Sequence, residues 1–369
     1  MNVLRRISLS RLALLCGLVV GVGISATALA SALGSSPSPP PKPLAQALHD
    51  ALAAPAVEGV SANVTLTNHL LEGAGLASGG SSQAAAISSN PLLAGGSGRL
   101  WIARDGRVRL ELQAEQGDTQ VIYDGHTLTV YDASSNTVYR YTPPAGETTE
   151  PPATSPRHGE APSVAKVEEA ITHLRAHMDV SEATPTDVAG RPAYTVRVAP
   201  KEGGSLIGGA ELSFDAAYGV PLRAAIYSTG NPSPVVELAA TEVSYGPIEE
   251  SVFAITPPAS AKVEDLSASS GANPQQPSPA GAGTTRPKLT TLGSGITAIA
   301  VLEAKAGSTG KQGEGGSLED LPKVSINGTS ASELRTALGT ILTFERSGVR
   351  YVLAGSVPPA AVEAQARGL

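Results

Sequence analysis

The chain has 369 residues, of which 41% are hydrophobic and 16% charged, and its formal net charge at pH 7 is −7. This acidic balance argues against a nucleic-acid partner and against electrostatic docking to anionic lipid headgroups, because both require a basic surface. The length, with 40 glycines and 29 prolines, leaves room for one sizeable domain and a smaller one joined by unstructured segments.

The N-terminus predicts export from the cytoplasm. Three arginines precede an apolar run, residues 12–30, which ends in Ala28-Leu29-Ala30. A positive segment, a hydrophobic segment and a small-residue cleavage site follow one another in this order in a signal peptide. We assign residues 1–30 to the signal peptide and residues 31–42 to a Ser/Pro-rich spacer. An uncleaved membrane anchor is the alternative.

Cleavage would remove the single cysteine of the chain, Cys16. Leu15 precedes it where a lipoprotein attachment motif needs a small residue, so we interpret Cys16 as part of the signal. The mature chain would then have no disulfide and no thiolate metal site. Loss of Arg5, Arg6 and Arg11 from a chain of charge −7 would leave −10.

The periodicity beyond the spacer changes from helical to strand-like. Residues 44–52 repeat their apolar side chains at helical spacing after Pro43, which predicts a short amphipathic helix. Residues 60–67 alternate between apolar and polar, as a half-buried strand does. The Gly/Ser/Ala-rich residues 73–98 are too poor in large side chains to fold on their own.

Strand patterns then recur in close succession. Tight-turn pairs such as Asp105-Gly106 and Asp124-Gly125 separate them, and the strands are expected at residues 99–103, 107–112, 119–123, 127–131 and 137–141. Connections this short allow only an antiparallel meander. After a Pro-rich loop at residues 143–162, apolar positions from Val164 to Met178, with Ser163 as the cap, predict a second helix.

A second set of strand patterns completes a domain at residues 43–265. The strands are expected at residues 193–198, 210–214, 222–228 and 235–245, with a closing segment at 253–258. We therefore predict an α+β fold in which a curled antiparallel β-sheet is covered by two helices. A flexible linker at 266–287 leads to a small C-terminal α+β module at 288–369. In it we expect strands at 296–302, 334–345 and 349–356, and a helix at 358–367.

No catalytic motif withstands inspection of the residues. His173 and His177 have the i, i+4 spacing of metal ligands, but no third ligand can be named. Residues 307–311 resemble the end of a phosphate-binding loop, yet Lys305 and Gln312 stand where glycine and Ser or Thr belong. A G-x-S-x-G serine motif does not occur. We expect no enzyme activity, no metal and no cofactor.

The predicted sheet has more apolar surface than two short helices can cover. With 3 Phe and 1 Trp in the chain, medium-sized aliphatic side chains would line its concave side. The result is either a thin packed core or a groove for an apolar ligand. The candidate groove residues are Leu48, Val64, Leu66, Leu100, Ile102, Val108, Leu110, Leu112, Val121, Tyr123, Leu128, Val130, Leu174, Leu212 and Phe214.

Three segments resemble the second half of LolA-like proteins, including the RseB/MucB branch. They are residues 188–194 (VAGRPAY), residues 215–223 (DAAYGVPLR) and residues 253–263 (FAITPPASAKV). The resemblance covers residues 44–263, and its motifs are structural turns. It implies an unclosed half-barrel whose apolar concave face takes lipoprotein acyl chains, with the helices as a lid and without a cofactor.

The resemblance implies one of two functions. The first is an extracytoplasmic carrier that holds lipid or the acyl chains of a lipoprotein. The alternative is an RseB/MucB-like envelope-stress regulator that acts on an anti-sigma factor, because the linker and the C-terminal module match that architecture. The expected partners are a lipid or an acylated lipoprotein and, in the alternative, a membrane-bound regulatory protein, but not nucleic acid.

Overall fold

The structure is a computed structural model that describes residues 38–72, 90–115, 117–143, 161–266, 288–305 and 321–369. The predicted signal peptide, most of the spacer, nearly all of the linker and the Gly-rich segment at 306–317 lie outside these residues, as does most of the loop at 143–162. Within the described ranges, no helix is both long and apolar enough to cross a membrane.

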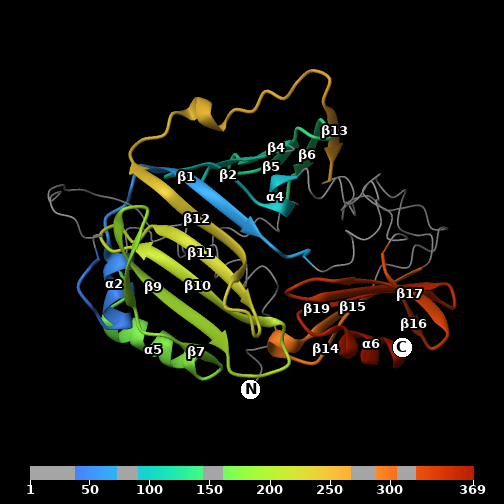
Figure 1. The fold of residues 1–369 in the computed structure, drawn as a ribbon. Helices are drawn as coiled ribbons and strands as arrows, with labels where there is room; N and C mark the ends of the chain where they lie inside the picture. The colour runs from blue at the N-terminus through green and yellow to red at the C-terminus, as the bar shows by residue number, and fades with distance from the viewer. Residues whose placement is uncertain (1–37, 73–89, 116, 144–160, 267–287, 306–320) are drawn as a thin grey trace, which may run out of the picture.

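The larger part of the chain forms one 13-stranded sheet (Figure 1). Its strands are β1 (Gly59–Asn68), β2 (Gly96–Ala103), β3 (Val108–Ala114), β4 (Gly117–Tyr123), β5 (Leu128–Asp132), β6 (Thr137–Tyr141), β7 (Met178–Val180), β8 (Thr184–Val188), β9 (Arg191–Pro200), β10 (Ile207–Asp215), β11 (Pro221–Ser228), β12 (Pro234–Tyr245) and β13 (Lys262–Asp265).

The sheet is curled and unclosed, which confirms the predicted fold class. The strand order is β13-β6-β5-β4-β3-β2-β1-β12-β11-β10-β9-β7, with β8 paired to β9, so the path starts at β13 and ends at β7. Two consecutive meanders, β1 to β6 and β9 to β12, are joined by pairing of β1 with β12. The complete sheet therefore depends on contact between the two halves of this part of the chain.

One edge corrects the prediction of a purely antiparallel sheet. After β12 the chain passes through a 3₁₀ turn, Glu250–Phe253, and returns as β13, which pairs parallel with β6. Lys262 begins this pairing by donating its backbone N–H to the carbonyl of Asn136 at 3.0 Å. The long return connection permits the parallel pairing, which a short turn could not.

Three helices lie against the main sheet. Helices α2 (Leu44–Ala53) and α5 (Val164–Arg175) pack beside each other and against β9 and β10, and their cluster includes Leu44, Ile171, Tyr194 and Phe214. Helix α4 (Pro91–Ala94) is a short third helix, lying near β1, β3 and β4 (Figure 1).

Two boundaries inferred from the sequence are wrong. Met178 does not continue the second helix but begins β7, because the helix ends where Ala176 and His177 bond back to His173 and Leu174. The end of the segment expected to be unstructured forms α4 and the start of β2. Asn90 makes this possible: its side chain caps α4, and proline is well tolerated at the first helical position.

The C-terminal residues form a separate six-stranded sheet in the order β14-β15-β19-β18-β17-β16. Its elements are β14 (Lys288–Leu292), a 3₁₀ turn (Gly295–Thr297), β15 (Ile299–Lys305), β16 (Lys323–Ile326), β17 (Thr329–Arg335), β18 (Thr340–Arg346), β19 (Val349–Gly355) and α6 (Pro359–Arg367). Helix α6 contributes Val362 and Ala366 to a core with Leu342 and Leu353.

The strand expected at residues 334–345 is two strands, and the one expected from Ile296 begins at Ile299. Thr336 closes the turn between β17 and β18 by bonding to Gly339 through both its backbone N–H and its hydroxyl, each at 2.8 Å. The apolar residues on both sides of this turn had hidden it in the sequence.

The two sheets touch through a few polar contacts. Leu206 donates its N–H to the carbonyl of Ser356 at 2.8 Å, and the Ser205 hydroxyl donates to the same oxygen at 3.1 Å. On the other side of the contact, the N–H of Ala337 bonds to the carbonyl of Leu70 at 3.0 Å. The C-terminal sheet therefore meets the main sheet just before the start of β10 and just beyond the end of β1.

Candidate ligand-binding face

The strand register brings the predicted groove residues of the sheet to one face. Residues directly opposite each other on paired strands project to the same side. One row runs Val130, Val121, Leu110, Leu100 and Ala62 across β5 to β1. The neighbouring rows on that side contain Tyr123, Leu128, Val108 and Ile102, and then Leu112 and Val64. We call this side, on which α2, α4 and α5 pack, the inner face.

The inner face continues into the second half of the sheet. Leu66 lies opposite Leu238 of β12, Leu238 opposite Ala224 of β11, Ala224 opposite Leu212 of β10, and Leu212 opposite Val196 of β9. This row of five apolar side chains crosses five strands, so the two meanders present one continuous surface.

Burial divides the predicted residues into three groups. Val64, Leu112 and Phe214 are buried and form the base of the face. Tyr123 and Leu128 are exposed, each at 37%. The remaining residues are half-buried, namely Leu48, Leu66, Leu100, Ile102, Val108, Leu110, Val121, Val130, Leu174 and Leu212.

Helices α2 and α5 already cover one end of the inner face. Phe214 is packed in their cluster with Tyr194, whose ring centroid lies 6.0 Å away, and Leu48 packs against the same cluster. The Tyr194 hydroxyl also donates to the carbonyl of Pro40 at 2.7 Å, which holds the chain segment before α2 in place. This end of the face is packed core, so Leu48 and Phe214 belong to the cover and not to an open surface.

Helix α4 also packs on the inner face, over β1, β3 and β4. Leu92 packs against the cluster of Ala62, Val64 and Leu112. Between α4 and the α2/α5 pair lies the row from Leu66 to Val196, where Ala224 is exposed and the other members are half-buried. The structure thus places the open apolar surface between two sets of helices. The sequence had not indicated Ala224 or Leu92 as part of it, because Ala224 is small and Leu92 lies in a glycine-rich stretch.

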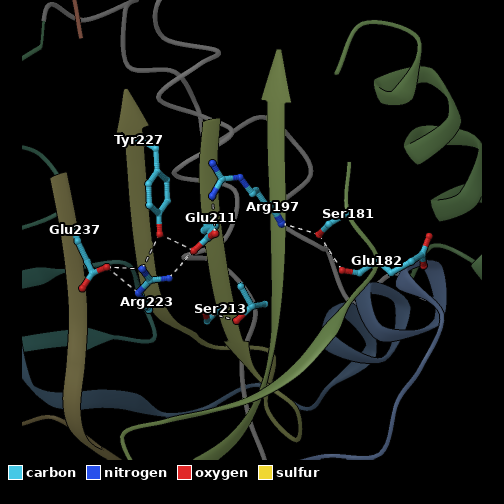
Figure 2. A network of polar contacts seen from close by, with 9 residues as sticks. Ser181, Glu182, Arg197, Glu211, Ser213, Arg223, Tyr227 and Glu237 are labelled. Carbon is cyan, nitrogen blue, oxygen red and sulfur yellow. Dashed lines mark hydrogen bonds and ion pairs between the residues drawn. The ribbon is translucent and has the colours of Figure 1, made fainter. Parts of the chain in front are cut away.

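The opposite face of β9 to β12 carries a polar network instead (Figure 2). Glu211 accepts hydrogen bonds from Arg197 at 2.9 Å, Arg223 at 2.9 Å and the Tyr227 hydroxyl at 2.7 Å. Arg223 also bonds to Glu237 on β12. The charges of Arg197, Glu211, Arg223 and Glu237 alternate across four strands, so the network is neutral and internally paired.

The network shifts the pKa values of its members. Burial alone would raise the pKa of Glu211, but the hydrogen bonds from Arg223, Tyr227 and Arg197 outweigh it and hold that pKa below its ordinary value. Burial, with the hydrogen bond to Glu211, raises the pKa of Tyr227. These shifts keep each group in the protonation state that the network needs, so they point to a structural role.

Two of the three segments that carry the family resemblance, residues 188–194 and 215–223, meet around Asp215, which is 1% exposed. Its carboxylate accepts hydrogen bonds from Arg191, from the Tyr245 hydroxyl at 2.8 Å, and from the backbone N–H groups of Ala217 and Tyr218 at 2.8 and 3.0 Å. Arg191 also lies over the rings of Tyr218 and Tyr245, at 5.3 and 4.6 Å from their centroids. The motifs therefore build a corner of the fold.

The residues considered for catalysis do not form a site in the described part of the chain. His173 and His177 are both exposed, and among the described residues no group of three or more His, Cys, Asp and Glu could hold a metal ion. A hollow of about 480 Å³ lies at the β2 to β3 turn, between Arg104, Arg107 and Ile248, away from the open part of the inner face.

Comparison with known proteins gives one family match in the sequence. The model of a family described as predicted periplasmic protein, DUF2092, matches residues 86–149, which span α4 to the end of β6 and so include half of the inner face. No curated protein sequence matches the chain.

Solved structures similar to this chain include MucB and LolA superfamily proteins. The Pseudomonas aeruginosa MucA/MucB complex is 15% identical, with a TM-score of 0.43, over 88% of this chain and 96% of that one. MucB in complex with MucA(peri) is 15% identical, with a TM-score of 0.42, over 88% of this chain and 94% of that one. A LolA superfamily protein from Nitrosomonas europaea is 9% identical, with a TM-score of 0.19, over 85% and 90%. These are the two groups that the turn motifs resemble.

Proposed function

We propose that the chain is an exported binding protein that holds acyl chains, of a lipid or of a lipoprotein, on the inner face of its main sheet. The observation that carries the proposal is the apolar row from Leu66 to Val196, which crosses five strands and stays partly exposed between α4 and the α2/α5 pair. The description of the family matched at residues 86–149 as periplasmic supports an extracytoplasmic location.

The chemistry of the inner face fits a ligand without a charge along its length. The rows of this face consist mainly of aliphatic side chains and tyrosine, and the polar residues Thr119 and Asp132, which continue the row of Val64 and Leu112, are both buried. The arginines and glutamates of β9 to β12 that form the polar network project to the opposite face. Burial of each methylene group on such a surface contributes about 0.8 kcal/mol. A chain of a dozen methylenes could therefore bind without any specific polar contact, while its headgroup stays in water.

The proposal is tested with two pairs of identical substitutions in the full chain. Val196→Glu and Leu212→Glu place a charge in the row that carries the proposal, and their matched controls are Val263→Glu on β13, where the side chain is 53% exposed, and Leu289→Glu on β14, at 70%. Titration with a fluorescent fatty acid should show loss of binding in the first pair only, with unchanged circular dichroism. Equal binding in all four variants would contradict the proposal.

A second candidate function is regulation through a protein partner, and the C-terminal module favours it. We propose that residues 288–369 form a unit of their own behind a linker at 266–287. Its sheet leaves Leu289 and Ile341 exposed, at 70% and 38%, and Leu289 lies on β14, at the edge of the sheet. A partner strand could add to such an edge.

This candidate differs from the first in which variant loses function. An envelope protein captured by the wild-type chain but not by Leu289→Glu would support the regulator. If the wild type and Leu289→Glu both capture it, or if neither does, the acyl-chain proposal remains the better account. In both functions the chain acts as a binding protein and not as an enzyme.

A further inference from the structure

We propose that the outer edge of β13, which faces away from β6, pairs with the same edge of a second copy of this chain, so that two main sheets join into one. Strand β13 is bonded on one side to β6, and no other strand of the described residues pairs with its far side. Figure 1 shows β13 at the end of the sheet. The inference concerns an edge of the sheet and not its inner face, so it does not depend on the acyl-chain proposal.

The backbone of β13 presents hydrogen-bonding groups at its outer edge. The N–H of Lys262 bonds to the carbonyl of Asn136 at 3.0 Å, and the N–H of Leu266, directly after the strand, bonds to the carbonyl of Arg140 at 2.8 Å. The backbone groups of successive strand residues point alternately to the two sides, so those of Val263 point away from β6. Such groups at a sheet edge are a template for another strand.

Two apolar side chains are exposed along β13 and directly after it. Val263 is 53% exposed and Leu266 is 46% exposed, and these are the most exposed large apolar side chains of the described main sheet and its connections. A strand paired with the outer edge would cover part of both. The same contact would therefore satisfy backbone groups and remove apolar surface from water.

Charge selects one register for two antiparallel copies of β13. Because the outward backbone groups belong to odd-numbered residues, odd residues face odd residues, and each possible register is centred on one residue that faces its own copy. Registers centred on Lys262, Glu264 or Asp265 place like charges directly opposite each other, which is destabilising. The register centred on Val263 places Val263 opposite itself and Lys262 opposite Glu264 of the other copy, twice.

The charges of β13 are therefore self-complementary. Edge strands commonly carry charges that keep another strand away, but Lys262 and Glu264 have opposite signs and lie on the same side, with Nζ and Oε1 2.9 Å apart. That side is the inner face, because Glu264 pairs with Tyr139 and Tyr139 with Val130. A two-fold axis relates the copies, as in most homodimers, and both inner faces lie on the same side of the joined sheet.

The first experiment changes the two charges and measures self-association of the full chain by sedimentation velocity over a range of concentrations. A contact this short buries less than the roughly 1,200 Å² of a stable complex, so we expect a reversible dimer. Lys262→Glu alone and Glu264→Lys alone each place like charges opposite each other twice, and each should dimerise at least about tenfold more weakly.

An equimolar mixture of these two variants restores opposite charges at both positions, so it should dimerise as the wild type does. This recovery cannot arise within one chain, which separates it from any effect of the substitutions on folding. Lys288→Glu is the matched control, because Lys288 lies on the edge strand of the C-terminal sheet and its side chain is 69% exposed. It should leave self-association unchanged.

The second experiment tests the register by disulfide cross-linking. In a Cys16→Ser background the chain has no other cysteine. Val263→Cys would place the Cα atoms of the two copies about 5.5 Å apart, within reach of a disulfide. Leu266→Cys, the matched control, would place them about 20 Å apart along the strands. Oxidation with diamide should therefore cross-link the first variant and not the second.

Four results would overturn the proposal. They are a wild-type chain that stays monomeric at every concentration, self-association unchanged in both charge variants, a mixture that associates no better than its components, and equal cross-linking at positions 263 and 266. None of these measurements uses a fatty acid, so failure of the acyl-chain proposal would not alter them.

Discussion

Asp215 offers the sharpest test of how the main sheet is held together. Its buried carboxylate accepts four hydrogen bonds, from Arg191, Tyr245 and two backbone N–H groups of the following turn. Burial, together with the charge of Asp215, also raises the pKa of Tyr245, so the phenol remains a donor. Asp215→Ala would leave all four donors without their acceptor.

The cost can be estimated from the four contacts. The side chain of Arg191 is 28% exposed and retains some access to water, whereas Tyr245 is held against Arg191 and Tyr218. Breaking a buried ion pair from one side costs about 3–5 kcal/mol, and partial solvation of Arg191 places the expected loss near the lower end, about 3 kcal/mol. Asp215→Asn keeps an acceptor for the turn and should lose about 2 kcal/mol.

Urea unfolding followed by the fluorescence of Trp101, on β2 of the same sheet, measures these changes. Adding Arg191→Met to Asp215→Ala should recover part of the loss, because it removes the charge left without a partner. A single Asp215→Ala variant within about 1 kcal/mol of the wild type, the typical net value of one hydrogen bond, would refute this account of the corner.

Three further predictions concern other parts of the chain. In thermal unfolding, Gly219→Ala should destabilise the protein more than twice as much as Gly190→Ala. Both glycines have positive φ, but the new Cβ at position 219 would lie 2.3 Å from the carbonyl oxygen of Ala51, whereas position 190 is open. Equal losses of stability would show that α2 can move away from the new Cβ at little cost. The pKa of Glu211 is held below its ordinary value in the folded protein, so the unfolded chain binds more protons near and below about pH 4 and stability falls as the pH falls through that range. Glu211→Gln should flatten this part of the plot of melting temperature against pH. An unchanged slope would exclude Glu211 as the source of the pH dependence. Asn327→Ala should lower the stability of the C-terminal sheet, measured by hydrogen exchange, by about 1 kcal/mol. Asn327 has φ +52°, and its side chain donates to the carbonyl of Arg367 at 2.8 Å. Full protection of the β16 amides in the variant would contradict this prediction.

The segment before β2 contributes to the inner face. Residues 73–98 interrupt the pattern of strands, and only their last part, from Asn90 onward, is described by the structure. That part places Leu92 on the inner face and ends in Gly96 and Gly98. A Cβ at Gly98 would lie 1.7 Å from the carbonyl oxygen of Glu111, so this glycine permits the close approach of β2 and β3.

The sequence by itself determined most of the longer strands of the main sheet and which side of each is apolar, whereas the short strands β7, β8, β13, β14 and β16 were not predicted. An alternation of period two fixes both at once, so the pattern alone places the rows containing Leu100, Leu110, Val121 and Val130 on one face. Turn residues such as Asp105-Gly106 fixed the order of the meander for the same local reason. The helices near residues 44 and 164 followed from their period of 3.6.

Only the tertiary structure decided what covers that face and what stays open. Pairing of β1 with β12, the parallel return of β13, and the position of α4 depend on contacts between residues far apart in the chain, which leave no periodic signal. Local pattern assigned Phe214 and Leu128 to the same groove, yet the first is core under α2 and α5 and the second is exposed. Burial is a property of the assembled layers, because a side chain's own sequence neighbours do not determine which helix will lie above it.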